Sequence, residues 1–156
     1  MLLYQAPVPL KTGARMSSFE PIHLTGANKG TRACPICTYV DTPGVQIWTD
    51  ASAASLDRAY ALAREAEAAK GPEKFVAFLV VDPTTPVADA DLVARGAGLK
   101  RVAITRLASS ADPAIGFHRF APGRGPLALV YAKRRTTAVL ADPRPGLLAS
   151  AIEALR

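Results

Sequence analysis

Residues 75–81, Phe-Val-Ala-Phe-Leu-Val-Val, form a continuous apolar run that Asp82-Pro83 closes. A short run of this kind is typical of a strand that lies inside a parallel sheet and is covered on both faces. The run therefore predicts a central strand with helices on either side of it. The stretch over residues 45–49 (VQIWT) is strand-like and predicts a second strand.

A helical pattern connects these two strands. It begins after a cap at Asp50 or Ser52, repeats apolar residues at helical spacing, and ends before Gly71-Pro72. A strand, a helix and a second strand in this order indicate a parallel pair with a right-handed crossover. Residues 19–25 predict a further strand, which Pro21 confines to a sheet edge.

Downstream of residue 82 the pattern continues with helices and strands, and then changes to a hairpin. The expected elements are a helix over 87–97, a strand over 102–105, a helical turn over 112–118, strands over 127–132 and 136–140 around a basic turn at 133–135, and a final helix over 143–156. The hairpin adds antiparallel strands at one edge, so the sheet is predicted to be mixed.

The amino-acid composition excludes several classes of protein. The chain has 156 residues, of which 49% are apolar and 6% aromatic, and its formal net charge is +6. These values indicate one soluble globular domain and exclude a disordered chain. No apolar run approaches the roughly 18 residues of a membrane span, and two cysteines are too few for a disulfide scaffold. Aromatic residues are too sparse for a nucleic-acid surface, so the charge is expected to favour anionic partners and thiolates.

Residues 34–37, Cys-Pro-Ile-Cys, carry the most specific chemistry. Two thiols at this spacing can close a small disulfide ring. If Cys34 begins a helix, free N–H groups and the helix dipole stabilise its thiolate, and Pro35 suits the first helical position. Arg32 and Lys29 add positive charge nearby. Cys34 is therefore predicted to be the attacking thiol and Cys37 the resolving thiol.

The order of elements from residue 45 to 156 resembles the thioredoxin-like fold, particularly its peroxiredoxin and thiol–disulfide oxidoreductase branches. The cysteine motif likewise resembles redox motifs of that superfamily, especially those of glutaredoxins. The resemblance implies an α/β three-layer sandwich with helices on both faces of a mixed sheet. Residues 1–18 are then an N-terminal arm and residues 19–156 a single domain. In the family a cis proline precedes the hairpin beside the substrate groove, and Gly125-Pro126 stands at the matching place.

The position of the cysteines departs from the family pattern. In thioredoxin-like oxidoreductases the pair directly follows the first core strand, whereas here it precedes the strand over 45–49. Two alignments are possible. In the first, residues 19–25 form the first core strand and the motif follows it. In the second, residues 45–49 form that strand and the motif lies on an upstream insertion. We favour the second alignment because the remaining elements then fall in family order. It predicts a redox pair displaced from the usual site.

Other uses of the cysteines can be weighed. A structural zinc site needs four ligands, and His23 and His118 could complete one only through long-range folding, unless two copies of the motif share a metal. The peroxidase pattern Pro-x-x-x-Thr-x-x-Cys is half present, with Thr31 in place and Ala27 at the proline position. A disulfide between Cys34 and Cys37 closes too short a loop to constrain the unfolded chain much, so a purely structural role explains this spacing poorly.

These observations predict a thiol–disulfide oxidoreductase that exchanges with protein or small-molecule thiols and disulfides. We expect it to use no cofactor or metal, to bind neither nucleic acid nor membrane, and to be a monomer or homodimer. No secretory signal is visible, which indicates the cytoplasm. The alternative is a non-catalytic thioredoxin-like binding module whose cysteines form a metal half-site or are vestigial, and the absence of a cysteine between Thr49 and Ser55 favours it.

Overall fold

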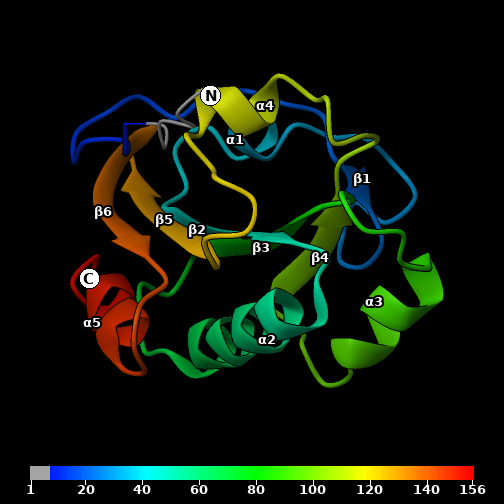
Figure 1. Ribbon diagram of the computed structural model, residues 1–156. Coiled ribbons are helices and arrows are strands. Elements are labelled where there is room, and N and C mark those ends of the chain that lie inside the picture. The colour runs from blue at the N-terminus through cyan, green and yellow to red at the C-terminus, as the bar shows by residue number, and fades with distance from the viewer. Residues whose placement is uncertain (1–7) are drawn as a thin grey trace.

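The computed structural model describes residues 8–156, and a six-stranded sheet lies at its centre (Figure 1). The strands lie in the order β1-β4-β3-β2-β5-β6. They are β1 (Ile22–His23), β2 (Gly44–Asp50), β3 (Val76–Asp82), β4 (Val102–Arg106), β5 (Leu127–Ala132) and β6 (Arg135–Ala141). The helices are α1 (Pro35–Thr38), α2 (Ala53–Ala68), α3 (Asp89–Arg95), α4 (Ala114–Phe117) and α5 (Leu147–Glu153).

Strands β2, β3 and β4 are parallel, and the other pairs are antiparallel. The apolar run that predicted a central strand is β3, which lies between β2 and β4 and is buried from Ala77 to Asp82. Strand β2 pairs with β3 on one side and with β5 on the other. The prediction that residues 45–49 form the core strand, with the cysteine motif upstream of it, is therefore confirmed.

Helices cover both faces of the sheet, as the α/β sandwich prediction requires. Figure 1 shows α2, α3 and α5 on one side and α1 and α4 on the other. Alternate residues of β2 divide between these layers, because successive side chains of a strand point to opposite faces. Ile47 packs in the cluster that contains Leu56 of α2, whereas Trp48 packs in the cluster that contains Ile36 of α1. No helix within residues 8–156 is long and apolar enough to cross a membrane.

The helices are shorter than the sequence patterns predicted. Helix α2 is the exception: it begins after its cap Ser52 and ends at Ala68, before Gly71, as expected. Helix α5 begins only at Leu147, because Gly146 adopts a left-handed conformation with φ of +93° and two prolines precede it. Helix α3 begins at Asp89 and ends before Gly96.

The segment before β1 runs along the β5–β6 hairpin. The N–H of Met16 donates to the carbonyl of Arg134 (2.8 Å), and the N–H of Gly13 donates to the carbonyl of Thr136 (2.7 Å). An isolated bridge also joins Arg15 to Arg135. Of the predicted arm over residues 1–18, residues 1–7 lie outside the described residues, and residues 13–16 are hydrogen-bonded to the hairpin.

The peptide bond between Gly125 and Pro126 is trans, since no residue in the described range has a cis bond. The prediction of a cis Pro126 is therefore wrong. The chain turns into β5 through Gly125, whose φ of +82° is accessible to glycine at little cost. The carbonyl of Pro126 accepts a hydrogen bond from the N–H of Asp142 (2.7 Å). Because Gly125 already makes the turn, the bond before Pro126 can keep the trans form that peptide bonds intrinsically prefer.

Candidate redox site

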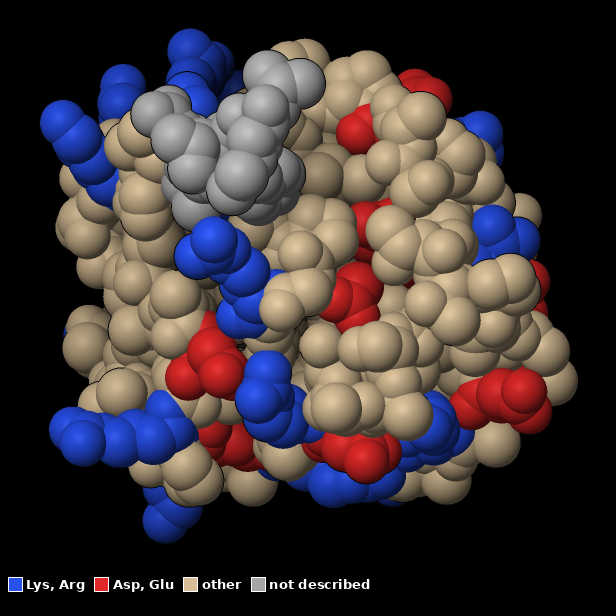
Figure 2. Space-filling view, in the orientation of Figure 1, with Lys and Arg blue, Asp and Glu red and all other residues tan. Residues whose placement is uncertain are grey.

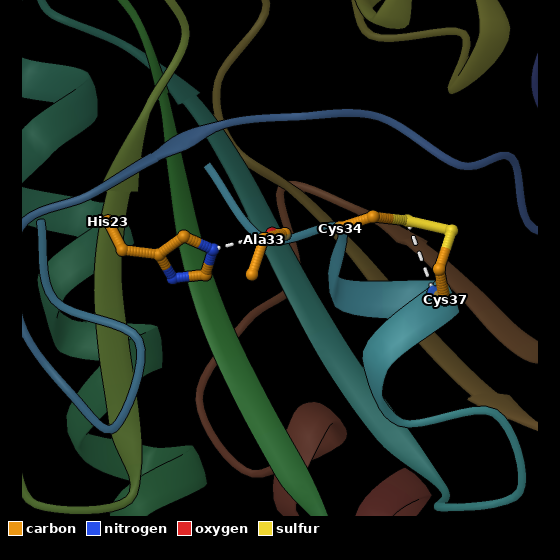
Figure 3. Close-up of a disulfide and its surroundings, with 4 residues drawn as sticks. All are labelled: His23, Ala33, Cys34 and Cys37. Atoms are coloured by element: carbon orange, nitrogen blue, oxygen red, sulfur yellow. Dashed lines mark hydrogen bonds between the residues drawn. A yellow bond between two sulfur atoms is a disulfide. The ribbon is translucent and has the colours of Figure 1, made fainter. Parts of the chain in front are cut away.

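Cys34 and Cys37 form a disulfide at the start of α1, with their Cα atoms 5.2 Å apart (Figure 3). Cys34 is the N-cap residue, and its Sγ accepts a hydrogen bond from the N–H of Cys37 (3.1 Å). Pro35 occupies the first helical position, as the motif predicted. In the reduced form the same N–H can stabilise a thiolate on Cys34.

The two cysteines differ in burial. Cys37 is exposed, whereas Cys34 is partly buried and packs against the apolar cluster beneath α1. Between them lie Pro35 and Ile36, which are both buried and pack α1 onto the sheet. The disulfide thus lies on a short surface helix whose inner side belongs to the core.

His23 of β1 holds the segment that enters the motif (Figure 3). Its Nε2 lies 2.7 Å from the carbonyl oxygen of Ala33, and because a carbonyl can only accept, Nε2 carries the proton. The backbone N–H of His23 donates to the carbonyl of Thr31 (3.0 Å), and the N–H of Gly30 donates to the carbonyl of His23 (2.9 Å). Residue 23 therefore holds the C-terminal end of the loop, the end that leads directly to the cysteines.

Two surface clefts meet at the disulfide. They have volumes of about 570 and 390 Å³ and share Ser18, Cys37 and Phe117. Phe117 of α4 is 57% exposed and lines both clefts.

Charged residues divide unequally between the clefts. Among residues 8–156, the larger is lined by Arg15 and Arg134 and by no carboxylate. The smaller contains Arg32 together with Glu20 and Asp112. Arg32, predicted to support the motif, does lie beside the cysteines, and its guanidinium donates to the carbonyl of Glu20 through Nε (3.1 Å) and Nη2 (2.9 Å).

Sequence reasoning did not identify the cleft residues Arg15, Ser18 and Phe117. They come from segments about a hundred positions apart that only the fold brings together. The one signal for Phe117 is its place in the predicted helical turn over 112–118. Nothing in the pattern of that turn distinguishes an exposed phenylalanine from a buried one.

Both histidines are buried, and within residues 8–156 neither forms a hydrogen bond with a cysteine. His118 is fully buried and stacks on Trp48, with 4.4 Å between ring centroids. Its Nδ1 lies 2.8 Å from the carbonyl oxygen of Ala114, to which it donates, and burial lowers the pKa of its imidazole. His23 bonds to the backbone as described. Within residues 8–156 no three Cys, His, Asp or Glu side chains gather in a metal-binding arrangement.

The start of α2, where the resemblance places the family's cysteines, carries serines instead. Ser52 caps this helix, and its Oγ accepts a hydrogen bond from the N–H of Ser55 (3.4 Å). The cap repeats the arrangement at Cys34 and Cys37 with oxygen in place of sulfur. Helices α1 and α2 lie on opposite faces of the sheet (Figure 1).

Gly125 and Pro126, the residues predicted to form a substrate groove, are not brought to the cysteines. They line a separate surface depression with Arg119 and Phe120, and neither contributes to the clefts at the disulfide. A side chain at residue 125 would collide with Arg58 of α2. Gly125 therefore lies beside the end of a side chain of the serine-capped helix, and neither residue lines a cleft at the disulfide.

Two buried aspartates end the neighbouring strands β2 and β3, in register with each other. Burial opposes ionisation of Asp50, but hydrogen bonds from Ser52, Gly123 and Ser55 outweigh it and lower its pKa. Asp82 is 1% exposed, and neither of its carboxyl oxygens has a hydrogen-bond partner. Burial and the nearby charge of Asp50 raise the pKa of Asp82 to about 6.

Comparison with known proteins identifies the fold. No family model matches the chain, and no curated protein sequence is similar to it. Among solved structures, one described as the thiol:disulfide interchange protein DsbE from Chlorobium tepidum aligns over 94% of this chain and 98% of its own, with a TM-score of 0.69 and 10% identity.

Two further structures agree with that likeness. The thioredoxin domain of a thiol-disulfide oxidoreductase from Bacteroides vulgatus has a TM-score of 0.66 and 14% identity, with 93% of this chain and 97% of that chain covered. A peroxiredoxin-like protein from Aquifex aeolicus has a TM-score of 0.64 and 12% identity, with 97% and 91% covered. The chain therefore has the thioredoxin-like fold, as the sequence resemblance implied.

Proposed function

We propose that this thioredoxin-like domain is a thiol–disulfide oxidoreductase whose Cys34 and Cys37 cycle between dithiol and disulfide. The observation that carries the proposal is the disulfide itself, which is closed between these residues on an exposed short helix at the meeting point of two clefts. Solved structures of similar fold described as thiol-disulfide oxidoreductases support it. Thiols and disulfides are then the substrate class.

The chemistry follows from the local geometry. Reduction of the pair breaks the S–S bond and oxidises two partner thiols to one disulfide, so two electrons and two protons are exchanged. The N–H of Cys37 lies where it can stabilise a thiolate on Cys34. Arg32 adds positive charge in the adjoining cleft, and Pro35 begins the helix without leaving an unpaired donor.

Thiol trapping across a graded series of reduced and oxidised glutathione tests the proposal. We expect one reversible two-electron transition between the dithiol and the intramolecular disulfide in the wild-type protein, and only a mixed disulfide with glutathione in Cys34→Ser or Cys37→Ser. Ser52→Ala is the matched control, because it alters the equivalent cap on α2 and leaves the sulfurs intact. A pair that fails to re-equilibrate with glutathione on the timescale of hours would contradict the proposal.

The second candidate function is a non-catalytic binding module. The serines at the start of α2 favour it, since the place where the family carries its cysteines has no thiol here. This reading predicts that the protein binds its partner equally well with Cys34 and Cys37 replaced by serine. A zinc assay on the reduced protein separates a metal half-site, which would hold one zinc per two chains, from vestigial cysteines.

A further inference from the structure

The two sulfur atoms of the disulfide are not equally accessible. Cys37 is exposed and lines both clefts, whereas Cys34 is partly buried and lines only the smaller one. Thiol–disulfide exchange depends on which sulfur the incoming thiolate can reach. Access from the larger cleft therefore leads to Cys37.

The stability of the departing thiolate also favours attack at Cys37. When a disulfide is attacked at one sulfur, the other departs as a thiolate, and it departs faster if that thiolate is stabilised. Sγ of Cys34 already accepts the N–H of Cys37. None of the hydrogen bonds formed among residues 8–156 reaches Sγ of Cys37. Cys34 is thus the better leaving group of the two.

We propose, on the premise of the function above, that an anionic peptide thiol enters the larger cleft and attacks Cys37. The partner sulfur bonds to Sγ of Cys37 as the Cys34–Cys37 bond breaks, and the electron pair remains on Sγ of Cys34. A second partner thiolate then attacks the partner sulfur of the mixed disulfide. This step releases an oxidised partner disulfide and leaves both cysteines reduced, with protons supplied by solvent.

This order reverses the one predicted from the sequence, in which Cys34 attacks and Cys37 resolves. The motif alone places the first cysteine at the helix start, where its thiolate is stabilised. That stabilisation is present, but in the folded protein it belongs to the less accessible sulfur. Cys34 is accordingly the thiolate that leaves, and in the reverse direction it is the thiolate that closes the ring.

The lining of the larger cleft argues for an anionic partner. Arg15 and Arg134 contribute two positive charges, and none of the described lining residues contributes a negative one. The bond from Met16 N–H to the Arg134 carbonyl keeps the two arginine-bearing segments together. Figure 2 shows Lys and Arg gathering at the upper left, over the end of the β5–β6 hairpin. Exposed Phe117 forms an apolar wall for the residues that flank the partner's cysteine.

The site of attack is tested by mapping the first mixed disulfide. Oxidised wild-type protein is mixed with a short peptide whose single cysteine is flanked by aspartates, quenched with acid, alkylated and sequenced by mass spectrometry. We expect the peptide on Cys37 and the alkyl group on Cys34, by about tenfold over the opposite pattern. The peptide on Cys34 would overturn this inference while leaving the proposed function intact. If no exchange occurs with any thiol, the proposed function fails and this inference with it.

The nature of the partner is tested by rates. The aspartate peptide should react about fivefold or more faster than a lysine-flanked peptide at low salt, and the preference should fade toward 1 M salt. Arg15→Gln with Arg134→Gln should remove most of the preference. Lys70→Gln with Lys74→Gln, two exposed residues outside both clefts, is the control and should not.

Two outcomes count against the anionic peptide partner. Equal rates for the aspartate and lysine peptides would mean that the arginines do not select the partner. Glutathione that reacts as fast as the aspartate peptide would mean that a small anionic thiol, rather than a peptide segment in contact with Phe117, is the partner. Phe117→Ala should slow the aspartate peptide and leave glutathione unaffected.

Discussion

Nε2 of His23 and the carbonyl oxygen of Ala33 lie 2.7 Å apart and join the edge strand to the residue immediately before Cys34. The histidine side chain is 2% exposed and its ring meets that of Phe78 edge-on. The redox motif is therefore positioned by a buried contact ten residues upstream as well as by its own helix.

Replacement of His23 by Phe should loosen the entry to the motif. The substitution keeps an aromatic ring against Phe78 but leaves the Ala33 carbonyl without its donor, which costs roughly 1–3 kcal/mol. Denaturant unfolding measures the loss, and hydrogen exchange should show faster opening over residues 24–33. Asn28→Ala, which removes only a bond to Tyr39, is the control. Unchanged exchange over that segment would refute the positioning role.

Asp82 should make the protein less stable as the pH rises. Its pKa is raised from 3.8 to about 6 in the folded state, so the folded protein holds this proton more tightly than the unfolded chain does. The stabilisation is complete below pH ~4 and is lost as the pH rises through about 6. The loss is roughly 2–3 kcal/mol between pH 4 and pH 8.

Asp82→Asn removes this titration. We expect the variant to be more stable than the wild type at pH 8, and the difference between them to shrink toward pH 4. Unfolding in urea at both pH values measures it. A wild type and variant that change in parallel with pH would assign the effect to other groups.

Ser52→Ala should lower stability without altering thiol exchange. The loss of the cap at the N-terminus of α2 costs about 1 kcal/mol. The rate of exchange with glutathione should equal that of the wild type, since Ser52 lines neither cleft at the disulfide. A slowed exchange would mean that the serine-capped helix takes part in the redox cycle.

Glu67 should be important for the attachment of β4. Its carboxylate accepts hydrogen bonds from three successive backbone N–H groups at residues 100, 101 and 102, over distances of 2.7–3.1 Å. Bonds to a charged acceptor are stronger than neutral ones, so Glu67→Ala should cost roughly 2 kcal/mol. Glu73→Ala, at an exposed position in the loop before β3, serves as the control. Equal stability of the two variants would show that the loop is held by packing alone.

Local chemistry made much of the fold predictable. The apolar run of β3 and the cap at Ser52 each depend on residues within a few positions, so the sequence indicated the central strands and α2 correctly. The strand predicted over 19–25 is much shorter than expected and covers only residues 22–23. The helix ends were less well predicted, because Gly146 and the neighbouring prolines stop α5 more abruptly than the apolar spacing indicates. The cis bond expected at Pro126 was wrong because the preceding glycine makes the turn by itself.

At the candidate site, the sequence by itself determined the two thiols, their spacing, and the position of Cys34 as the N-cap of α1, where its Sγ accepts the N–H of Cys37. These depend on three consecutive peptide units, which any short helix reproduces. The tertiary structure alone decided which face of the sheet carries the motif and which sulfur is exposed. It also decided which residues surround them: Arg15, Phe117 and Arg134 meet at Cys37 only because the sheet order brings distant segments together. Burial and proximity are properties of the packed molecule, and no local pattern encodes them.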